Sequence, residues 1–275
     1  MNGEKITQSV ADLVAQIPHG AKVAVFKDCG VPMELGRALI RRRIRDLHIV
    51  TVPTGGILVD MLIGAGCVAT VETAGVTLGE FGLAQRFTQA VKSGAVQVKD
   101  ATCPAVYAGL QAAQKGIPFM PLRGLIGSDV AASREDFRVI NNPFAEDDPI
   151  VCLPAIKPDF SIFHAPMADR EGNVYISRQA EMKIMAQASR ATLVTVETIV
   201  EHNLLEDPIL APATLNGFYV DAIAAAPRGA WPLNLPAHYD YDREALAEYA
   251  RACASAEGFA DWLQRHVFNA EEVAA

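Results

Sequence analysis

Glycine-bearing turns that follow apolar segments are the features of this 275-residue chain with the clearest chemical potential. Residues 160–176, FSIFHAPMADREGNVYI, pass from an apolar stretch through a polar turn into a second apolar stretch. In the turn, Gly172 and Asn173 tolerate positive φ, and the Asp169 carboxylate can accept backbone N–H groups. His164 is a candidate for hydrogen bonding at a ligand site or for a structural role. A plain β-hairpin explains the segment on local chemistry alone, so the functional interpretation depends on the rest of the chain.

Three other turns carry glycines in the same way: Asp28-Cys29-Gly30, Thr54-Gly55-Gly56 and Gly79-Glu80-Phe81-Gly82. Glycine allows a ligand to approach the backbone closely, and N–H groups directed into one cleft can stabilise an oxyanion. Glu80 is the carboxylate that glycines flank, which makes it the candidate catalytic residue. The alternative is that Glu80 caps a helix beginning near Leu83, because acidic residues favour the first turn of a helix.

Strands and helices are expected to alternate along the chain, and this alternation predicts how the turns are positioned. The expected strands are Lys22–Phe26, Leu47–Val52, Val68–Glu72, Phe119–Pro121, Ile150–Leu153, Phe160–Phe163, Thr192–Val196 and Tyr219–Ala224. The expected helices are Ile6–Ile17, Met33–Arg43, Ala84–Lys92, Pro104–Lys115 with Gly116 at its end, and a C-terminal helix, or two meeting near Gly258.

This pattern predicts an α/β fold with an open, mainly parallel sheet flanked by helices on both faces. In such sheets ligands bind beyond the carboxyl ends of the strands, so the glycine turns should gather along one rim. Residues 122–149 show little regular pattern, which predicts a functional or mobile loop. No linker is evident, and we expect residues 1–275 to form a single domain.

Composition excludes several classes of function. Hydrophobic residues make up 51% and charged residues 20%, values typical of a soluble α/β protein. The net charge of −8 argues against nucleic-acid binding, which needs clustered cations. The basic cluster Arg41–Arg43 ends a helical pattern, where cations complement the helix dipole, and contact with a phosphorylated ligand is the alternative.

The five cysteines are odd in number and far apart, which predicts a reducing cytoplasm and no zinc site. The first ten residues lack the apolar core of a secretion signal, and no apolar run reaches the ~18 residues of a membrane span. We therefore expect a cytoplasmic protein that does not enter the membrane.

Common catalytic motifs find little support. Residues 64–69, GAGCVA, match a dinucleotide fingerprint, but the residues that follow are expected to form a strand instead of a helix. The chain has no P-loop lysine, no G-x-S-x-G and no H-E-x-x-H, so serine nucleophiles and metal hydrolysis are not indicated. No metal site is expected.

Six segments, taken in order, resemble the α subunit of the family I CoA-transferases, in the branch of glutaconate CoA-transferase. They are Phe26–Pro32, Gly79–Phe87, Gly116–Asp129, His164–Asn173, Val194–Glu197 and Ala226–Pro232. The resemblance implies the CoA-transferase fold and assembly with a CoA-transferase β subunit, usually as α2β2. It implies acyl-CoA and carboxylic acid substrates, with coenzyme A as a substrate and no tightly bound cofactor.

In that family the acyl-CoA thioester is attacked by a glutamate that the β subunit supplies, and a glutamyl–CoA thioester follows. This chain has no Ser-Glu-Asn-Gly nucleophile segment, as an α subunit should not, and is expected to be inactive alone. On this resemblance we expect the following roles for residues of the site. Asp28, Cys29, Gly30, Gly55 and Gly56 line the cleft, and Gly79, Glu80 and Gly82 border the thioester. Arg123 and Ser128 contact a carboxylate or the CoA, and His164, Asp169, Gly172 and Asn173 form the rim.

Two departures leave alternatives open. Ala24-Val25-Phe26 replaces the family's Gly-Gly-Phe, and Lys27 with Asp28 adds charges that suit a polar acyl group or an altered reaction. Some relatives hydrolyse CoA thioesters or open rings, and Glu80 would serve such chemistry. A noncatalytic small-molecule sensor is the alternative from another class, but it calls for a DNA-binding segment that is not seen.

Overall fold

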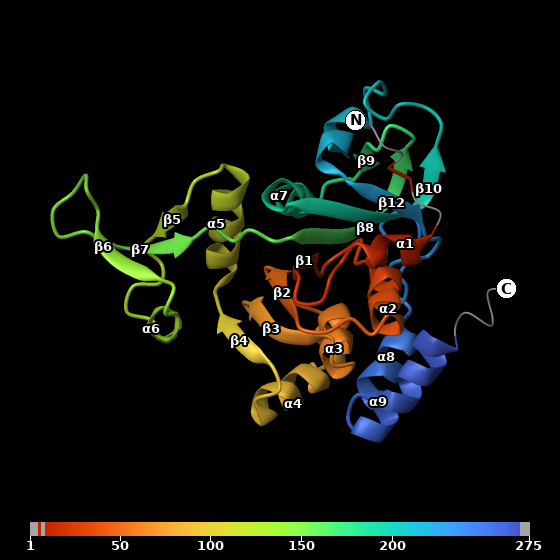
Figure 1. Ribbon diagram of the computed structural model, residues 1–275, viewed down its shortest axis with the longest axis horizontal. Coiled ribbons are helices and arrows are strands. Elements are labelled where there is room, and N and C mark those ends of the chain that lie inside the picture. Colours follow the sequence, from red (N-terminus) through yellow and green to blue (C-terminus); the bar gives the residue numbers. More distant parts are fainter. Residues whose placement is uncertain (1–4, 7–8, 270–275) are drawn as a thin grey trace.

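The computed structural model describes residues 5–6 and 9–269, and a parallel sheet runs through its centre (Figure 1). Among these residues, seven strands pair in parallel in the order β12-β10-β8-β1-β2-β3-β4. Their bounds are β1 Lys22–Phe26, β2 Leu47–Val52, β3 Val68–Thr73, β4 Gln97–Asp100, β8 Phe160–Asp169, β10 Ala191–Val200 and β12 Ala222–Ala225. The predicted α/β class with an open, mainly parallel sheet is confirmed.

Helices cover both faces of this sheet because its strands alternate apolar side chains between two cores. In β1, Val23 and Val25 face one buried cluster, whereas Ala24 and Phe26 face the other. The first cluster contains residues of α1 Val10–Ala15, α2 Met33–Arg41, α3 Ile57–Gly64, α8 Arg243–Ala252 and α9 Ala256–Leu263. The second contains residues of α5 Cys103–Gln114 and α7 Ala180–Ala188.

The hairpin expected after β8 is present. Strand β9, Val174–Tyr175, pairs antiparallel with Met167 and Ala168 of β8, and Gly172 in the turn has a φ of +88°. Strand β11, Thr214–Leu215, pairs antiparallel with β9 and so adds a third strand to this hairpin. The hairpin lies at the part of β8 that extends beyond the end of β1.

Residues 117–156 form an arm that projects from the body and holds a second, antiparallel sheet (Figure 1). Its elements are β5 Phe119–Leu122, α6 Asp129–Ser133, β6 Arg138–Asn141 and β7 Pro149–Pro154. The expectation of an irregular segment at 122–149 is therefore wrong. These elements span only four to six residues, and β6 is exposed along its length, so no burial period marks them in the sequence.

Buried charges fix the arm to the main sheet. The Glu72 carboxylate of β3 lies 2.8 Å from the Arg134 guanidinium, which follows α6, and 3.2 Å from Lys22 Nζ. Burial raises the pKa of Glu72, but His48, Lys22 and Arg134 outweigh burial and lower it to about 2. The carboxylate therefore stays ionised inside the protein and holds both parts together.

Several element boundaries differ from the expectation. Helix α1 begins at Val10, Ile6 instead bridges to Ile223, and residues 7–8 of the expected helix lie outside the described residues. The short helix η3, Gly217–Tyr219, replaces the start of the last expected strand. Helices α3 and α7 and strand β4 were not expected. Helix α3 is buried on all sides and β4 is partly exposed, so neither leaves a period in the sequence, whereas α7 is a nine-residue helix with a mixture of buried and exposed positions.

Other expectations are confirmed. Gly64 ends α3 and Val68 begins β3, so residues 64–69 lead from a helix into a strand, the reverse of the order that a dinucleotide fingerprint requires. Arg41 lies in the last turn of α2 and Arg42 bonds carbonyl groups at the end of α1, which supports the helix-end interpretation of the basic cluster. No helix within the described residues is long and apolar enough to cross a membrane.

Candidate active site

The strand order changes direction between β1 and β8, and the expected ligand position lies at their carboxyl ends. From β1 the sheet continues through β2 to β4 on one side and through β8 to β12 on the other. Val25 is level with Ile162, so Lys27 continues level with His164. The turn after β1 and the centre of β8 therefore meet at this edge.

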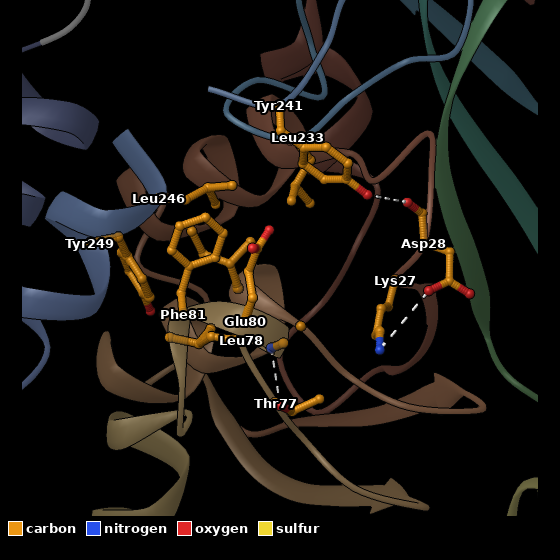
Figure 2. Close-up of a pocket in the computed structure, with 13 residues that line it drawn as sticks. Lys27, Asp28, Thr77, Leu78, Glu80, Phe81, Leu233, Tyr241, Leu246 and Tyr249 are labelled. Carbon is orange, nitrogen blue, oxygen red and sulfur yellow. Dashed lines mark hydrogen bonds and ion pairs between the residues drawn. The ribbon is translucent and has the colours of Figure 1, made fainter. Parts of the chain in front are cut away.

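A cavity of about 250 Å³ opens beside this edge (Figure 2). It is lined by Lys27, Asp28, Gly56, Ile57, Thr77, Leu78, Gly79, Glu80, Phe81, Leu233, Tyr241, Leu246 and Tyr249. The turns after β1, β2 and β3 form one side of the cavity, and the loop 226–242 with α8 forms the other. The expected gathering of glycine turns at one rim is confirmed for these three turns.

The cavity has a charged end and an apolar end. Figure 2 shows Lys27 and Asp28 on one side, with Leu78, Phe81 and Leu246 on the other. Lys27 Nζ lies 4.0 Å from the Asp28 carboxylate, and both side chains are partly exposed. Such a cavity suits a ligand with a hydrocarbon part and a polar or anionic part.

The turn that carries Lys27 and Asp28 is fixed by Gly30. The Gly30 carbonyl oxygen accepts a 2.7 Å hydrogen bond from His164 N–H, and the glycine has a φ of +62°. Cys29 is buried beside this contact, and burial, with Asp28 and Glu181, raises the pKa of its thiol to about 11. The thiol is therefore protonated and unreactive at neutral pH.

The second turn brings the backbone to the cavity. Gly55 N–H donates to the carbonyl of Gly75 at 2.8 Å, and Gly56 is the N-cap of α3. A Cβ at Gly56 would lie 3.6 Å from the Lys27 side chain, so the lysine stem packs on this glycine. Gly56 lines the cavity, whereas Gly55 packs behind it against Thr51 and Val59.

Glu80 lines the cavity and lies in the short helix η1, Gly79–Phe81. Its two carboxylate oxygens accept hydrogen bonds of 2.9 and 2.6 Å from the guanidinium of Arg243, the first residue of α8. It does not cap the following helix, α4 Gln85–Ser93, whose N-cap residue is Ala84. The capping interpretation is therefore wrong, because the carboxylate is held by a residue 163 positions away. Gly79 and Gly82, with φ of +63° and +100°, form the turn around it.

His164 is fully buried and belongs to a hydrogen-bonded network behind the cavity. Its Nδ1 lies 2.9 Å from Thr195 Oγ1 and its Nε2 lies 2.7 Å from Glu197 Oε1. Glu197 also accepts from the N–H of Arg228 and the hydroxyl of Tyr239. Burial raises the pKa of Glu197, but these bonds outweigh it and lower the pKa to about 2. The network joins β8 and β10 to loop 226–242, which carries Leu233 and Tyr241 into the cavity wall.

Asp169, Gly172 and Asn173 organise the hairpin instead of lining the cavity. The Asp169 carboxylate accepts from Glu171 N–H, Asn173 N–H, the Asn173 side chain and Leu204 N–H, at 2.8 to 2.9 Å. Asp169 ends β8 roughly 16 Å beyond His164 along the strand. None of the three is among the residues that line the cavity.

Arg123 and Ser128 lie in the arm. Arg123 is exposed and pairs with Asp148 at 2.6 Å, and Ser128 caps α6 by accepting from Ala131 N–H. Neither lines the cavity. Their expected contact with a carboxylate or with CoA stays a prediction.

Sequence reasoning missed the cavity residues that come from the C-terminal region. Leu233, Leu246 and Tyr249 follow the last parallel strand, and their apolar character marks them as core residues only. The sequence feature that could have pointed to Tyr249 is Asp60 of α3, whose carboxylate accepts a 2.9 Å hydrogen bond from the Tyr249 hydroxyl. Asp60 is fully buried in the apolar run 57–63, and a carboxylate in such a run requires donors from elsewhere.

Tyr249→Phe should lower the free energy of unfolding by about 2 kcal/mol, because the buried Asp60 carboxylate would lose a donor. Burial raises the pKa of Asp60, and a protonated carboxyl needs fewer donors, so the loss should shrink as the pH is lowered. Urea denaturation at pH 7 and at pH 5 measures both effects. Tyr241→Phe is the control, because Tyr241 is half exposed and its hydroxyl makes only a 3.5 Å contact. Equal losses in the two variants would contradict the role of the Asp60 bond.

Comparison with known proteins places these features in a family. The profile of the family described as Coenzyme A transferase matches residues 7–226. The A subunit of glutaconate CoA-transferase from Acidaminococcus fermentans is 29% identical over 96% of this chain and 88% of that protein. The crystal structure of this transferase superposes with a TM-score of 0.88 at 26% identity, covering 96% of this chain and 89% of the other.

Two other relatives are similar to nearly the whole chain. The cholesterol ring-cleaving hydrolase IpdA subunit of Rhodococcus jostii is 26% identical over 96% of this chain and 92% of that protein. An uncharacterized protein of Archaeoglobus fulgidus is 30% identical over 97% of this chain. The chain spans only 60% of the length of that archaeal protein.

Proposed function

The chain belongs to the family I CoA-transferases and is one of their α-type subunits, and on that premise we propose that it moves CoA between carboxylic acids together with a CoA-transferase β subunit. The assembly is proposed as α2β2, with residues 1–275 acting as one domain. Acyl-CoA and a free carboxylic acid are the substrates. Coenzyme A serves as a substrate and no tightly bound cofactor takes part.

The observation that carries this proposal is a surface cavity whose carboxylates are not prepared to attack. Glu80 is held by both nitrogens of the Arg243 fork, and Asp28 is 65% exposed beside Lys27. The partly buried Glu197 and the fully buried Asp60 are bonded to protein donors. Covalent transfer therefore draws its attacking glutamate from the partner, as the absence of a nucleophile segment also indicates.

In the proposed reaction the partner glutamate attacks the thioester carbonyl carbon, the C–S bond breaks, and CoA thiolate leaves. The thiolate attacks the glutamyl carbonyl of the anhydride, which releases the first acid and leaves a glutamyl–CoA thioester. The acceptor carboxylate then repeats these steps in reverse. Each attack develops an oxyanion, and Gly56, which lines the cavity at the N-terminus of α3, is the proposed source of a backbone N–H for it.

Hydrolysis or ring opening of a CoA thioester is the second candidate, supported by Glu80 in the cavity lining and by similarity to the IpdA subunit. Here Glu80 would activate water as a general base. General base catalysis typically contributes 10²- to 10⁴-fold, so Glu80→Gln should reduce hydrolysis by about that factor.

Co-expression with the neighbouring reading frame, followed by an assay of CoA exchange between two acids, tests the proposal. We expect exchange in the complex, none in the isolated chain, and less than about a tenfold loss in Glu80→Gln. Release of free CoA without an acceptor acid, abolished by Glu80→Gln, would replace transfer by hydrolysis. A complex with neither activity on any acyl-CoA would refute both.

A further inference from the structure

An exposed ion pair between Glu80 and Arg243 lies beside the cavity, which Glu80 lines. Glu80, in η1, lines the cavity, and Arg243 begins α8, which supplies Leu246 and Tyr249 to the lining without being a lining residue itself. The pair is bidentate, with N–O distances of 2.9 and 2.6 Å, and both side chains are more than half exposed. The ion pair therefore connects η1 with the start of α8.

Arg243 occupies a position that disfavours a cation. It is the first residue of α8, where the unpaired N–H groups carry positive partial charge and acidic residues are preferred. The guanidinium lies 5.7 Å from the centre of the Phe81 ring, which orients it toward the cavity side of the helix. Its placement is therefore set by what it binds and not by helix stability.

The contact that Arg243 makes with Glu80 is easily exchanged. Both groups keep most of their hydration, and exposed ion pairs are weak because water and salt screen them. The fork nevertheless matches a carboxylate in two parallel hydrogen bonds, the geometry that guanidinium groups use for carboxylate recognition. On the other side of the cavity the charged lining residues are Lys27 and Asp28, with the Lys27 Nζ atom 4.0 Å from the Asp28 carboxylate.

We propose that Arg243 is the carboxylate-binding residue of this site, and that Glu80 occupies it as a stand-in until the carboxylate of an acid substrate displaces it. Displacement transfers the guanidinium to the substrate and releases the Glu80 carboxylate into the cavity. The ion pair thus acts as a gate that couples binding of the acid to the availability of Glu80. This inference deepens the proposed function and rests on it for the identity of the substrate as an acid.

Binding measurements test the exchange without relying on turnover. Butyrate is the carboxylate probe, butyramide its neutral analogue, and coenzyme A the phosphate-bearing probe, each titrated by calorimetry into the full chain and into its complex with the partner. Arg243→Gln should weaken butyrate binding about tenfold, since a charge-assisted bidentate contact is lost. Arg243→Lys should give an intermediate loss, because lysine keeps the charge without the fork.

The direction in which Glu80→Gln changes the butyrate affinity distinguishes the two explanations of the ion pair. If Glu80 competes for Arg243, its removal should tighten butyrate binding several-fold, whereas a pair that merely supports the cavity walls would weaken binding in both variants. Arg170→Gln is the matched control, because Arg170 forms an equally exposed bidentate pair with Glu201 in the hairpin turn. Its butyrate affinity should equal that of the unmodified protein.

Three outcomes overturn the inference: equal weakening in Glu80→Gln and Arg243→Gln, unchanged butyrate affinity in Arg243→Gln, or a loss for coenzyme A instead of butyrate. A complex without catalytic activity would refute only the proposed function. The inference about Arg243 would still be tested, because the opposite changes in butyrate affinity of Glu80→Gln and Arg243→Gln are measured by binding and not by turnover.

Discussion

Replacing Gly30 by alanine is expected to lower the free energy of unfolding by at least about 3 kcal/mol. The added Cβ would lie 2.2 Å from the carbonyl oxygen of His164 and 2.6 Å from the Met182 side chain. The methionine can move, but the oxygen belongs to a central strand. The φ of +62° adds the strain of a left-handed residue, about 1 kcal/mol.

Thermal unfolding measures this effect, and a drop in Tm of roughly 6–12 °C corresponds to it for a chain of this size. Gly20→Ala is the matched control, because Gly20 has a φ of +75° and nothing within 4 Å of the added Cβ. It should lose only the ~1 kcal/mol of backbone strain. A Gly30 variant no less stable than the Gly20 variant would show that the close approach to β8 is not maintained in solution.

Gly30→Ala should also change the cavity, because the same turn carries Lys27 and Asp28. A shift of the turn away from β8 moves these side chains, and misplacement by about 1 Å can cost a hundredfold in rate. Activity of the complex measured well below the variant's Tm separates this effect from unfolding.

Arg134→Met is expected to destabilise the protein by about 3 kcal/mol, because it leaves the Glu72 carboxylate buried with less compensating charge. Glu72 and Arg134 are both nearly inaccessible to solvent, with 2% and 5% of their side chains exposed. Lys22 and His48 remain within 3.3 Å of the carboxylate, so the loss is partial. Urea denaturation measures it, with Arg170→Met as the control for an exposed pair, expected within about 0.5 kcal/mol.

The pH dependence of this effect has a defined sign. The folded-state pKa of Glu72 is about 2, below the ordinary 4.5, so its stabilisation is complete above pH 4.5 and lost as the pH falls toward 2. Removing Arg134 should raise that pKa, and the acid-unfolding midpoint should move to higher pH. The double variant Glu72→Gln, Arg134→Met should recover part of the stability, since the buried carboxylate charge of residue 72 is then removed. A double variant no more stable than Arg134→Met would refute the explanation.

Arg134 also connects the arm to the body, which gives its loss a local consequence. The Lys99–Asp136 pair, at 2.8 Å, and the stacking of Arg134 on Phe137 lie at the same junction. Amide hydrogen exchange should therefore increase in the arm of the Arg134 variant before the central strands are affected.

Local patterns were sufficient for the central strands and for the turns beside them. Strands β1 and β2 have the predicted bounds, because apolar runs of five or six residues ending in Asp, Pro or Gly leave few alternatives. The hairpin after His164 was also recognisable. The function of the hairpin was not recognisable. The same turn sequence is compatible with an Asp169 carboxylate that faces a ligand and with one that accepts four hydrogen bonds inside the protein, as the structure has it.

The sequence by itself determined the family, the parallel α/β architecture and the three glycine turns at one rim, because these depend on residues close together in the chain. The tertiary structure alone decided what faces those turns. Hydrogen bonds join Glu80 to Arg243, 163 residues away in the sequence, and His164 to Glu197, 33 residues away. Another joins Tyr249 to Asp60, 189 residues away. The physical reason is that a charge or hydroxyl reveals its need for a partner in the sequence, but only the path of the chain through space determines which distant group satisfies it.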